Sequence, residues 1–123
     1  MISEPLIAIV DDDDGMRASL DALVRSLGYR TTTFDAAERL LGSEHIGEAG
    51  CVISDIEMPG GMDGIALTMK LLATAPARPV ILVSAYVTDR IRTAAMAAGA
   101  FAVLKKPFVG ETLIEAIESA LPK

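Results

Sequence analysis

Five short strand-like runs alternate with longer segments of helical spacing, and this alternation constrains the fold more than any other feature of the sequence. Four of the runs are apolar and the second is rich in threonine and aromatic residues; they cover residues 6–10, 29–34, 52–54, 80–83 and 101–104. Apolar runs of this length are typical of parallel strands buried on both faces. Strands that alternate with helices form parallel sheets with right-handed crossovers. We therefore predict an α/β fold, a doubly wound five-stranded parallel sheet with helices on both faces.

The segments between the runs carry signals for five helices. Asp14 is the expected cap of the first helix, with Asp13 directed outward. Asp35 is a cap candidate for a short second helix, and Thr88 for the fourth. Apolar residues at helical spacing place the third helix after the glycines at 60 and 61. The buried stripe of the last helix is predicted to consist of Leu113, Ile114, Ile117 and Leu121.

Composition limits what such a chain can do. With 123 residues the chain is long enough for one core and too short for two ordinary domains, so residues 1–123 are predicted to form a single domain. Hydrophobic residues make up 51% of the chain and aromatic residues only 4%, which requires an aliphatic core. The formal net charge of −6 argues against direct binding of nucleic acid, because contacts to phosphates require clustered lysine and arginine.

Cysteine use and hydropathy narrow the cellular setting. Cys51 is the only cysteine, so no intrachain disulfide and no Cys/His zinc site is available, and its expected place is the core. His45 is the only histidine and is expected to be exposed. The N-terminus lacks a basic segment followed by an apolar one, and no run approaches the roughly 18 apolar residues of a membrane span. We expect a cytoplasmic protein without membrane contacts.

Polar side chains follow the apolar runs at the points where the strands are predicted to end. In a doubly wound sheet the ligand crevice lies at the carboxyl ends of the strands. Three acids, a hydroxyl and an ammonium group are expected there: Asp11, Asp12, Asp55, Ser84 and Lys106. Carboxylates held this close repel one another, which favours a bound cation, and Mg²⁺ suits a site with few carboxylates and a phosphate ligand.

The chemistry that this set of residues favours is phosphoryl transfer. Asp12 and Asp55 are the expected direct ligands of Mg²⁺. Asp55 is the expected phosphoryl acceptor, with the charge of the phosphoryl group met by the metal, by the ammonium of Lys106 and by the hydroxyl of Ser84. The product is an acyl phosphate, which water can hydrolyse.

Several blocks of sequence resemble the response-regulator receiver domains of bacterial two-component signalling, and they do so over essentially the whole chain. The blocks are Ile9-Val10-Asp11-Asp12, Ser54-Asp55 with Met58-Pro59, Val83-Ser84-Ala85, Ala98-Gly99-Ala100 and Lys106-Pro107-Phe108. The resemblance implies a flavodoxin-like sheet in the order 2-1-3-4-5 and phosphorylation of Asp55 by a histidine kinase or a phosphotransfer protein. It also implies Mg²⁺ bound by Asp12, Asp55 and the backbone carbonyl of Glu57, with Asp11 acting through water, and a cis peptide bond before Pro107.

The sequence departs from the family pattern in two places. The segment Pro59-Gly60-Gly61-Met62-Asp63-Gly64 contains one residue more than is usual between the proline and the helix glycine, which predicts a longer loop above Asp55. The position three before the lysine is commonly an aromatic switch residue and is Val103 here; Phe101 is displaced from it by two. Tyr86 and Glu57 flank the predicted site, and we hypothesise that they control the access of attacking water.

The resemblance also places the signalling surface. Receivers generally report phosphorylation through the fourth helix, fifth strand and fifth helix, to an output domain or a partner protein. Both signs of charge are present on that face, on Arg90, Arg92 and Lys105 and on Glu111, Glu115 and Glu118. A homodimer with crossed salt bridges on phosphorylation is one hypothesis, and a solvated surface is the other.

Two functions of other classes fit parts of the sequence. A phosphatase of the haloacid dehalogenase type has an apolar strand followed by Asp-x-Asp, which residues 11–13 satisfy, but it leaves Asp55 without a role. A flavodoxin-like cofactor domain has a similar topology, but four consecutive aspartates in the first loop repel the phosphate of a cofactor.

Overall fold

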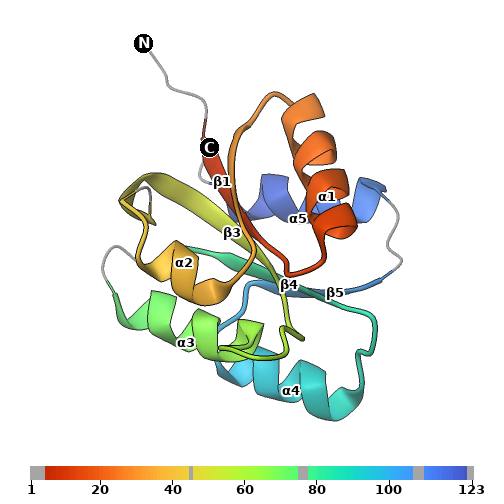
Figure 1. Ribbon diagram of the computed structural model, residues 1–123. Helices are drawn as coiled ribbons and strands as arrows, with labels where there is room; N and C mark the ends of the chain where they lie inside the picture. Colours follow the sequence, from red (N-terminus) through yellow and green to blue (C-terminus); the bar gives the residue numbers. More distant parts are fainter. Residues whose placement is uncertain (1–4, 45, 75–77, 107–109, 122–123) are drawn as a thin grey trace.

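A single five-stranded parallel sheet organises the molecule (Figure 1). The computed structural model describes residues 5–44, 46–74, 78–106 and 110–121. The strands are β1 (Leu6–Val10), β2 (Arg30–Phe34), β3 (Ala49–Asp55), β4 (Val80–Ser84) and β5 (Ala102–Lys105), paired in the order β2-β1-β3-β4-β5. The helices are α1 (Asp14–Ser26), α2 (Ala37–Leu41), α3 (Gly64–Ala73), α4 (Asp89–Ala97) and α5 (Gly110–Ala120), with a short 3-10 turn η1 (Ile46–Glu48) before β3. The predicted fold and strand order are confirmed.

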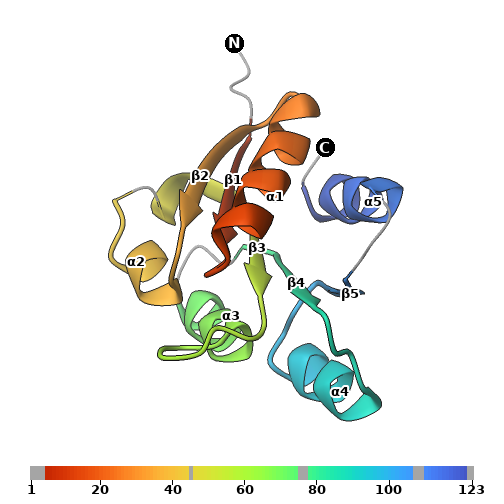
Figure 2. The same cartoon turned by 45° about the vertical axis from the view of Figure 1, so that its right-hand side comes forward.

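Helices cover both faces of the sheet, and each face has its own hydrophobic cluster (Figures 1 and 2). Helices α2, α3 and α4 pack on one face, where Leu40, Leu67 and Ala95 contact alternate strand residues such as Val52. Helices α1 and α5 pack on the other face, where Leu20 and Ile117 meet the intervening strand residues. Because side chains of a strand alternate between the faces, continuous apolar runs supply both clusters at once.

Strand β3 lies at the centre of the sheet and is longer than predicted. It begins at Ala49 rather than Val52 and ends at Asp55 itself, and every residue in it except Gly50 is buried. Its pairing with β1 shifts between Leu6 and Ile7, which marks an irregularity near its start. Strand β1 has the predicted range, β2 and β4 differ from theirs by one residue at one end, and β5 is shifted by one residue, as is common for element boundaries.

The first helix begins differently from the prediction. Asp13, not Asp14, is the cap: its side chain accepts a hydrogen bond from the backbone N–H of Met16 at 2.7 Å, and its backbone is extended. Asp14 is the first helical residue and forms an exposed ion pair of 2.6 Å with Arg17. The prediction of Asp14 as the cap was therefore wrong, although Asp13 is exposed, as expected. Either acid favours the positive end of the helix dipole, so only the backbone conformation decides which one caps it.

The other predicted caps had mixed outcomes. Thr88 caps α4 by accepting a hydrogen bond from Ile91 N–H at 3.1 Å, as predicted. Ala36 occupies the cap position of α2, where no side chain among the described residues caps the helix. Asp35 instead pairs with Arg39 one turn later, at 2.8 Å. The last helix buries Leu113, Ile117 and the following Leu121, as its spacing predicted, whereas Ile114, which was predicted in the same stripe, is only half-buried.

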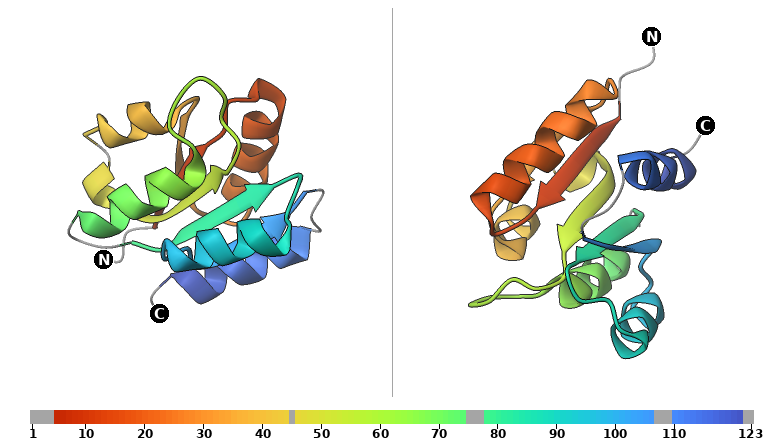
Figure 3. Two further views of the ribbon diagram at one scale, coloured as in Figure 1. Left: turned by 90° about the horizontal axis from the view of Figure 1, so that it is seen from below. Right: turned by 90° about the vertical axis from the view of Figure 1, so that its right-hand side faces the viewer.

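The loop between β3 and α3 extends from the carboxyl end of the sheet (Figure 3). Its far end is fixed against the start of the loop. The backbone N–H of Gly64 donates to the carbonyl oxygen of Ile56 at 2.9 Å. A Cβ atom at Gly64 would overlap the carbonyl oxygen of Asp55, so glycine is required where α3 begins against β3. Glu38 on α2 holds the middle of the loop by accepting from Met62 N–H at 2.9 Å, and this bond lowers the pKa of Glu38.

The structure tests the prediction that Cys51 lies in the core and the prediction about membrane spans. Cys51 is fully buried in the cluster beneath α1 and α5, and burial raises its pKa to about 12. Within the described part of the chain, no helix has both the length and the apolar character that crossing a bilayer requires. The predictions for His45 and for the peptide bond before Pro107 concern positions outside the described residues.

Candidate functional site

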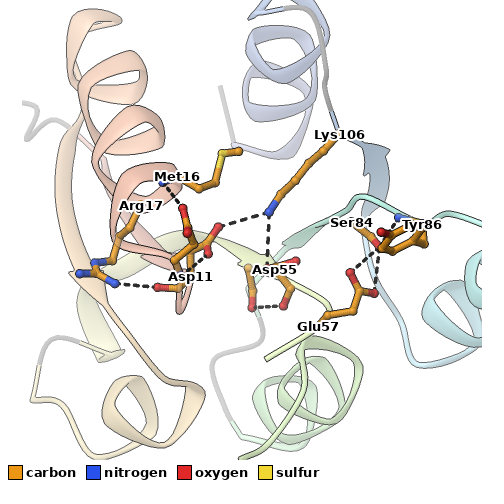
Figure 4. A network of polar contacts seen from close by, with 10 residues as sticks. Asp11, Met16, Arg17, Asp55, Glu57, Ser84, Tyr86 and Lys106 are labelled. Atoms are coloured by element: carbon orange, nitrogen blue, oxygen red, sulfur yellow. Dashed lines mark hydrogen bonds and ion pairs between the residues drawn. The ribbon is translucent and has the colours of Figure 1, made fainter. Parts of the chain in front are cut away.

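The predicted site residues meet at the carboxyl edge of the sheet (Figure 4). Asp11 follows β1, Asp55 ends β3, Ser84 ends β4 and Lys106 follows β5. Asp11, Asp12 and Asp55 each offer a carboxylate oxygen, and these oxygens lie within 4.8 Å of one another. The parallel order of β1, β3 and β4 thus assembles residues that are far apart in the sequence.

Asp55 is a buried carboxylate with spare bonding capacity. The residue is 7% exposed, and its Oδ1 is buried without a hydrogen-bond partner among the described residues. Burial raises the pKa of Asp55 to about 6; Lys106 opposes this shift, while Asp11 and Glu57 add to it. An unpaired buried carboxylate oxygen is unfavourable, and it keeps a lone pair that can bind a cation or act as a nucleophile.

Lys106 neutralises part of this charge. Its Nζ lies 3.4 Å from Oδ2 of Asp55 and 3.4 Å from Oδ2 of Asp11, so one ammonium group bridges two carboxylates. Its backbone N–H donates to the carbonyl oxygen of Ser84 at 2.7 Å, which fixes the residue to β4 just past the end of β5. Lys105, the residue before it, is exposed.

Asp11 is fully buried and its polar groups are satisfied. Its Oδ1 accepts from the backbone N–H of Asp13 at 2.9 Å, and its carbonyl oxygen accepts from Nη1 of Arg17 at 2.9 Å. The acidic turn is therefore tied to the first turn of α1. Asp12 is exposed and directs its carboxylate toward the same cluster.

Ser84 lies on the other side of Asp55 from Asp11 and has partners that the sequence did not reveal (Figure 4). Its hydroxyl lies 2.7 Å from Oε1 and 2.8 Å from Oε2 of Glu57, and it accepts from the backbone N–H of Tyr86 at 3.0 Å. Strand register is the signal that could have found this pair: Asp55 aligns with Val83, so the residues following each strand emerge side by side.

The residues present fit a magnesium ion. Mg²⁺ prefers oxygen ligands, takes one or two carboxylates and retains water. The three clustered aspartates supply such oxygens, and the unpartnered Oδ1 of Asp55 is the kind of atom that a cation would satisfy. The adjacent hollow, of about 290 Å³, is lined by three acids, Asp12, Asp35 and Glu38, and by Arg39, together with the loop over residues 58–62. The acids outnumber the single arginine, which is unfavourable for the phosphate of a flavin-type cofactor.

Val103 occupies the position that is commonly an aromatic switch residue in receiver domains. Val103 is 5% exposed and contributes to the core, whereas Phe101 is 43% exposed and precedes β5. Phe101 therefore lies at the opposite end of β5 from Lys106. Tyr86 lies two residues after Ser84 in the chain and is 73% exposed.

The fold and the acidic edge together define a doubly wound phosphoacceptor domain, and comparison with known proteins gives the family. Residues 7–118 match the family of the response regulator receiver domain. The chain is 36% identical over 121 residues to the transcriptional regulatory protein FixJ of Bradyrhizobium diazoefficiens, covering 98% of this chain and 58% of FixJ. It is 34% identical over 123 residues to the C4-dicarboxylate transport transcriptional regulatory protein DctD of Rhizobium meliloti, covering 100% of this chain and 26% of DctD.

Solved structures agree. The BeF3-activated DrrB receiver domain matches with a TM-score of 0.86 at 26% identity, covering 95% of this chain and 97% of that one. The response regulator StyR matches with a TM-score of 0.82 at 37% identity, covering 97% of this chain and 60% of StyR. The chain belongs to the response regulator receiver family of two-component signalling, and a phosphoacceptor role follows from that membership. It spans only part of the length of FixJ and DctD.

Proposed function

We propose that Asp55 is the residue that accepts the phosphoryl group. A carboxylate oxygen of Asp55 attacks the phosphorus atom, an O–P bond forms, and the bond from phosphorus to the leaving group breaks. With acetyl phosphate as donor, acetate leaves; with a phosphohistidine, the imidazole nitrogen leaves. The observation that carries the proposal is the buried Oδ1 of Asp55, which has no partner among the described residues although Lys106 lies beside Oδ2 of the same carboxylate.

Lys106 and Ser84 would serve the transfer by electrostatics and positioning. Lys106 already contacts Asp55 at 3.4 Å, so its ammonium is placed to meet the charge of phosphoryl oxygens. Ser84 is the last residue of the neighbouring strand β4, and its hydroxyl would donate a hydrogen bond to one of those oxygens. Such preorganised donors account for much of the catalysis of phosphoryl transfer.

Asp11, Asp12, Asp55 and the backbone carbonyl of Glu57 are the groups that would hold Mg²⁺. The acids gather in one cluster, as a cation site requires. When bound, the ion would neutralise the carboxylates and the phosphoryl oxygens. The residues of the chain contribute by holding the acidic turn against α1, through the bond from Arg17 to the carbonyl oxygen of Asp11.

Phosphoryl release by water would return Asp55 to its free carboxylate. Water attacks phosphorus, the O–P bond to Asp55 breaks, and inorganic phosphate leaves. Glu57 and Tyr86 flank Ser84 beside the acceptor, and we propose that they limit the access of water. A Tyr86→Ala variant is then expected to lose its phosphoryl group faster; an unchanged rate would count against this role.

The partners follow from the family at the level of class. A histidine kinase or a phosphotransfer protein would supply the phosphoryl group in the cytoplasm, and the face of α4, β5 and α5 would report it to an output domain or a partner protein, or by forming a homodimer. Charges of both signs are exposed there, including Arg92 on α4 and Glu115 on α5. FixJ and DctD are transcriptional regulatory proteins, so transcriptional output through a further module is one form of this proposal.

We also propose that residues 1–123 form one domain.

The test is the intact mass of the protein after incubation with acetyl phosphate and Mg²⁺. We expect wild-type protein to gain one phosphoryl group and an Asp55→Asn variant to gain none. Replacing Mg²⁺ by EDTA should abolish the gain, and an Asp89→Asn variant, at an exposed position in the first turn of α4, should behave like wild type. Phosphorylation that persists in Asp55→Asn would place the acceptor elsewhere. No adduct under any condition would instead indicate a receiver that binds its partner without phosphorylation.

A further inference from the structure

The hydroxyl of Ser84 is fully engaged in the structure, and its partners are not the acceptor carboxylate. A serine hydroxyl has one proton to donate. The only acceptors of that proton among the described residues are the two carboxylate oxygens of Glu57, at 2.7 and 2.8 Å. The backbone N–H of Tyr86, at 3.0 Å, occupies the hydroxyl oxygen as an acceptor. Ser84 is itself buried, at the end of β4.

This engagement conflicts with the role that Ser84 has in phosphoryl binding. To donate to a phosphoryl oxygen on Asp55, Ser84 must withdraw its proton from Glu57. Hydrogen bonds to an ionised acceptor are among the stronger ones in proteins, so the exchange is not free. Lys106, in contrast, already contacts Asp55 and needs no release. Lys106 can therefore bind the phosphoryl group from its present position, whereas Ser84 must first break its hydrogen bond to Glu57.

We propose that Glu57 is a positioning residue that holds Ser84 in a resting orientation, and that its carboxylate competes with the phosphoryl group for the Ser84 hydroxyl. The proposal rests on the phosphoacceptor function of Asp55. It assigns to the side chain of Glu57 a role separate from that of its backbone carbonyl. Glu57 weakens the phosphoryl-bound state by stabilising the state without it.

Release of Ser84 has a consequence at Tyr86. The bond from Tyr86 N–H to the Ser84 hydroxyl joins the serine to the loop between β4 and α4, and the Tyr86 ring is 73% exposed. Val103 provides no aromatic ring in β5 to follow the serine. A movement of Ser84 is therefore transmitted first to the backbone at Tyr86. The environment of that ring changes when the phosphoryl group or its analogue binds.

A double-mutant cycle with fluoroberyllate as the phosphoryl analogue tests the competition. The affinity of fluoroberyllate with saturating Mg²⁺ is measured by titration calorimetry for wild type, Glu57→Ala, Ser84→Ala and the double variant. Removal of Glu57 relieves the competition and also removes a negative charge near the anion. Only the charge effect remains in the Ser84→Ala background. We expect Glu57→Ala to tighten binding about tenfold more in the presence of Ser84 than in its absence.

A Glu57→Gln variant separates charge from hydrogen bonding. Glutamine is neutral but retains an acceptor oxygen for Ser84, so it should bind the analogue less tightly than Glu57→Ala does. In the Ser84→Ala background the two variants should bind alike. Equal effects of Glu57→Ala in both backgrounds would overturn the proposal and leave only electrostatics. Failure of wild-type protein to bind the analogue at all would instead overturn the phosphoacceptor function itself.

The response of Tyr86 provides a second readout. The chain has no tryptophan and two tyrosines, so a Tyr29→Phe variant reports tyrosine fluorescence from Tyr86 alone. We expect fluoroberyllate to change this signal, and Glu57→Ala to shift the signal of the free protein toward that of the bound protein. A signal that responds to the analogue but not to Glu57→Ala would contradict the resting role of Glu57. Matching melting temperatures of the variants would exclude a general loss of structure.

Discussion

Strand β3 combines two regions of opposite character. In its interior, Val52 and Ile53 are fully buried and pack into the clusters on the two faces of the sheet. At its carboxyl end, Asp55 is also buried, but one carboxylate oxygen lacks a partner among the described residues and its pKa is raised to about 6. Burial stabilises the fold in the first region and opposes it in the second. The packed interior therefore holds in place a group that the fold alone would not favour.

The neighbouring acid Asp11 shows that burial alone does not create this difference. Asp11 is 0% exposed, but its carboxylate oxygens receive a backbone N–H and the ammonium of Lys106. Asp55 shares that ammonium and lacks the backbone donor at Oδ1. An unsatisfied hydrogen-bonding oxygen, rather than burial, distinguishes Asp55, the proposed acceptor, from Asp11.

The largest effect is expected from breaking the packed region. An Ile53→Ala variant removes a fully buried side chain and leaves a cavity, so we expect it to lose about 2 to 5 kcal/mol of the free energy of unfolding. Urea denaturation followed by circular dichroism measures the loss. An Ile65→Ala variant, at a position only partly buried, is the control and should lose less. Equal losses at the two positions would contradict the assignment of β3 as the centre of the core.

A change of the opposite sign, a gain in the free energy of unfolding, is expected at Asp55, the proposed acceptor. An Asp55→Asn variant should gain about 1 to 2 kcal/mol of stability in metal-free buffer near neutral pH, because a neutral group no longer suffers desolvation. The pKa of Asp55 is higher in the folded state than its ordinary value of 3.8. The folded protein thus binds the proton more tightly, and the stability linked to it is present at about pH 4 and is lost as the pH rises through about 6.

The difference between variant and wild type should accordingly increase with pH. Thermal melts in EDTA at several pH values between about pH 4 and about pH 7 measure it. Asp12→Asn, which changes an exposed acid of the same cluster, is the control and should shift stability by less than about 0.5 kcal/mol. A gain for Asp55→Asn that falls as the pH rises would contradict the raised pKa.

A smaller loss of stability is expected at Asp13, an acid near the same edge of the sheet whose carboxylate accepts a hydrogen bond from Met16 N–H. Asp13→Ala removes the cap of α1 and should lose about 1 kcal/mol. Asp14→Ala removes only an exposed ion pair and should lose less than about 0.5 kcal/mol. Urea denaturation of the two variants compares adjacent aspartates directly. The reverse order would restore Asp14 as the cap.

The smallest effect is expected at the thiol in the packed region. Cys51 is fully buried and its pKa is raised to about 12 by burial, so the reactive thiolate is scarce at neutral pH. We expect native protein to resist alkylation by iodoacetamide, as followed by intact mass, and urea-unfolded protein to react fully. Modification of native protein at the unfolded rate would show that β3 opens readily and would weaken the contrast within it.

The fold and the members of the site could be predicted from the sequence because both follow from local patterns. Apolar runs define the strands, and in a parallel sheet the residues just after those runs must share one edge. Asp11, Asp55, Ser84 and Lys106 each follow or end such a run, so their meeting required no knowledge of side-chain geometry.

The finer arrangement depends on conformations that local patterns do not determine. Four consecutive aspartates have the same tendency to cap a helix, and the extended backbone of Asp13 decided between them. Glu57 and Ser84 are 27 residues apart and meet through a loop whose path is set by Glu38 and Gly64. The exposure of Met69 and Leu72 on α3 could not be predicted either, because hydropathy alone does not show where the buried face of a helix ends.

The fixed ends of the loop between β3 and α3 affect how this family can diversify. The bond from Gly64 to Ile56 closes the loop at its base, directly after Asp55, so residues between them can be added without displacing the strand. The closure entropy of a loop rises only slowly with its length. The additional residue that comparison with the family pattern predicts in the Gly60–Gly61 segment would be tolerated for this reason. The same segment is a position at which a short reporter peptide can be inserted while the phosphoacceptor remains in register.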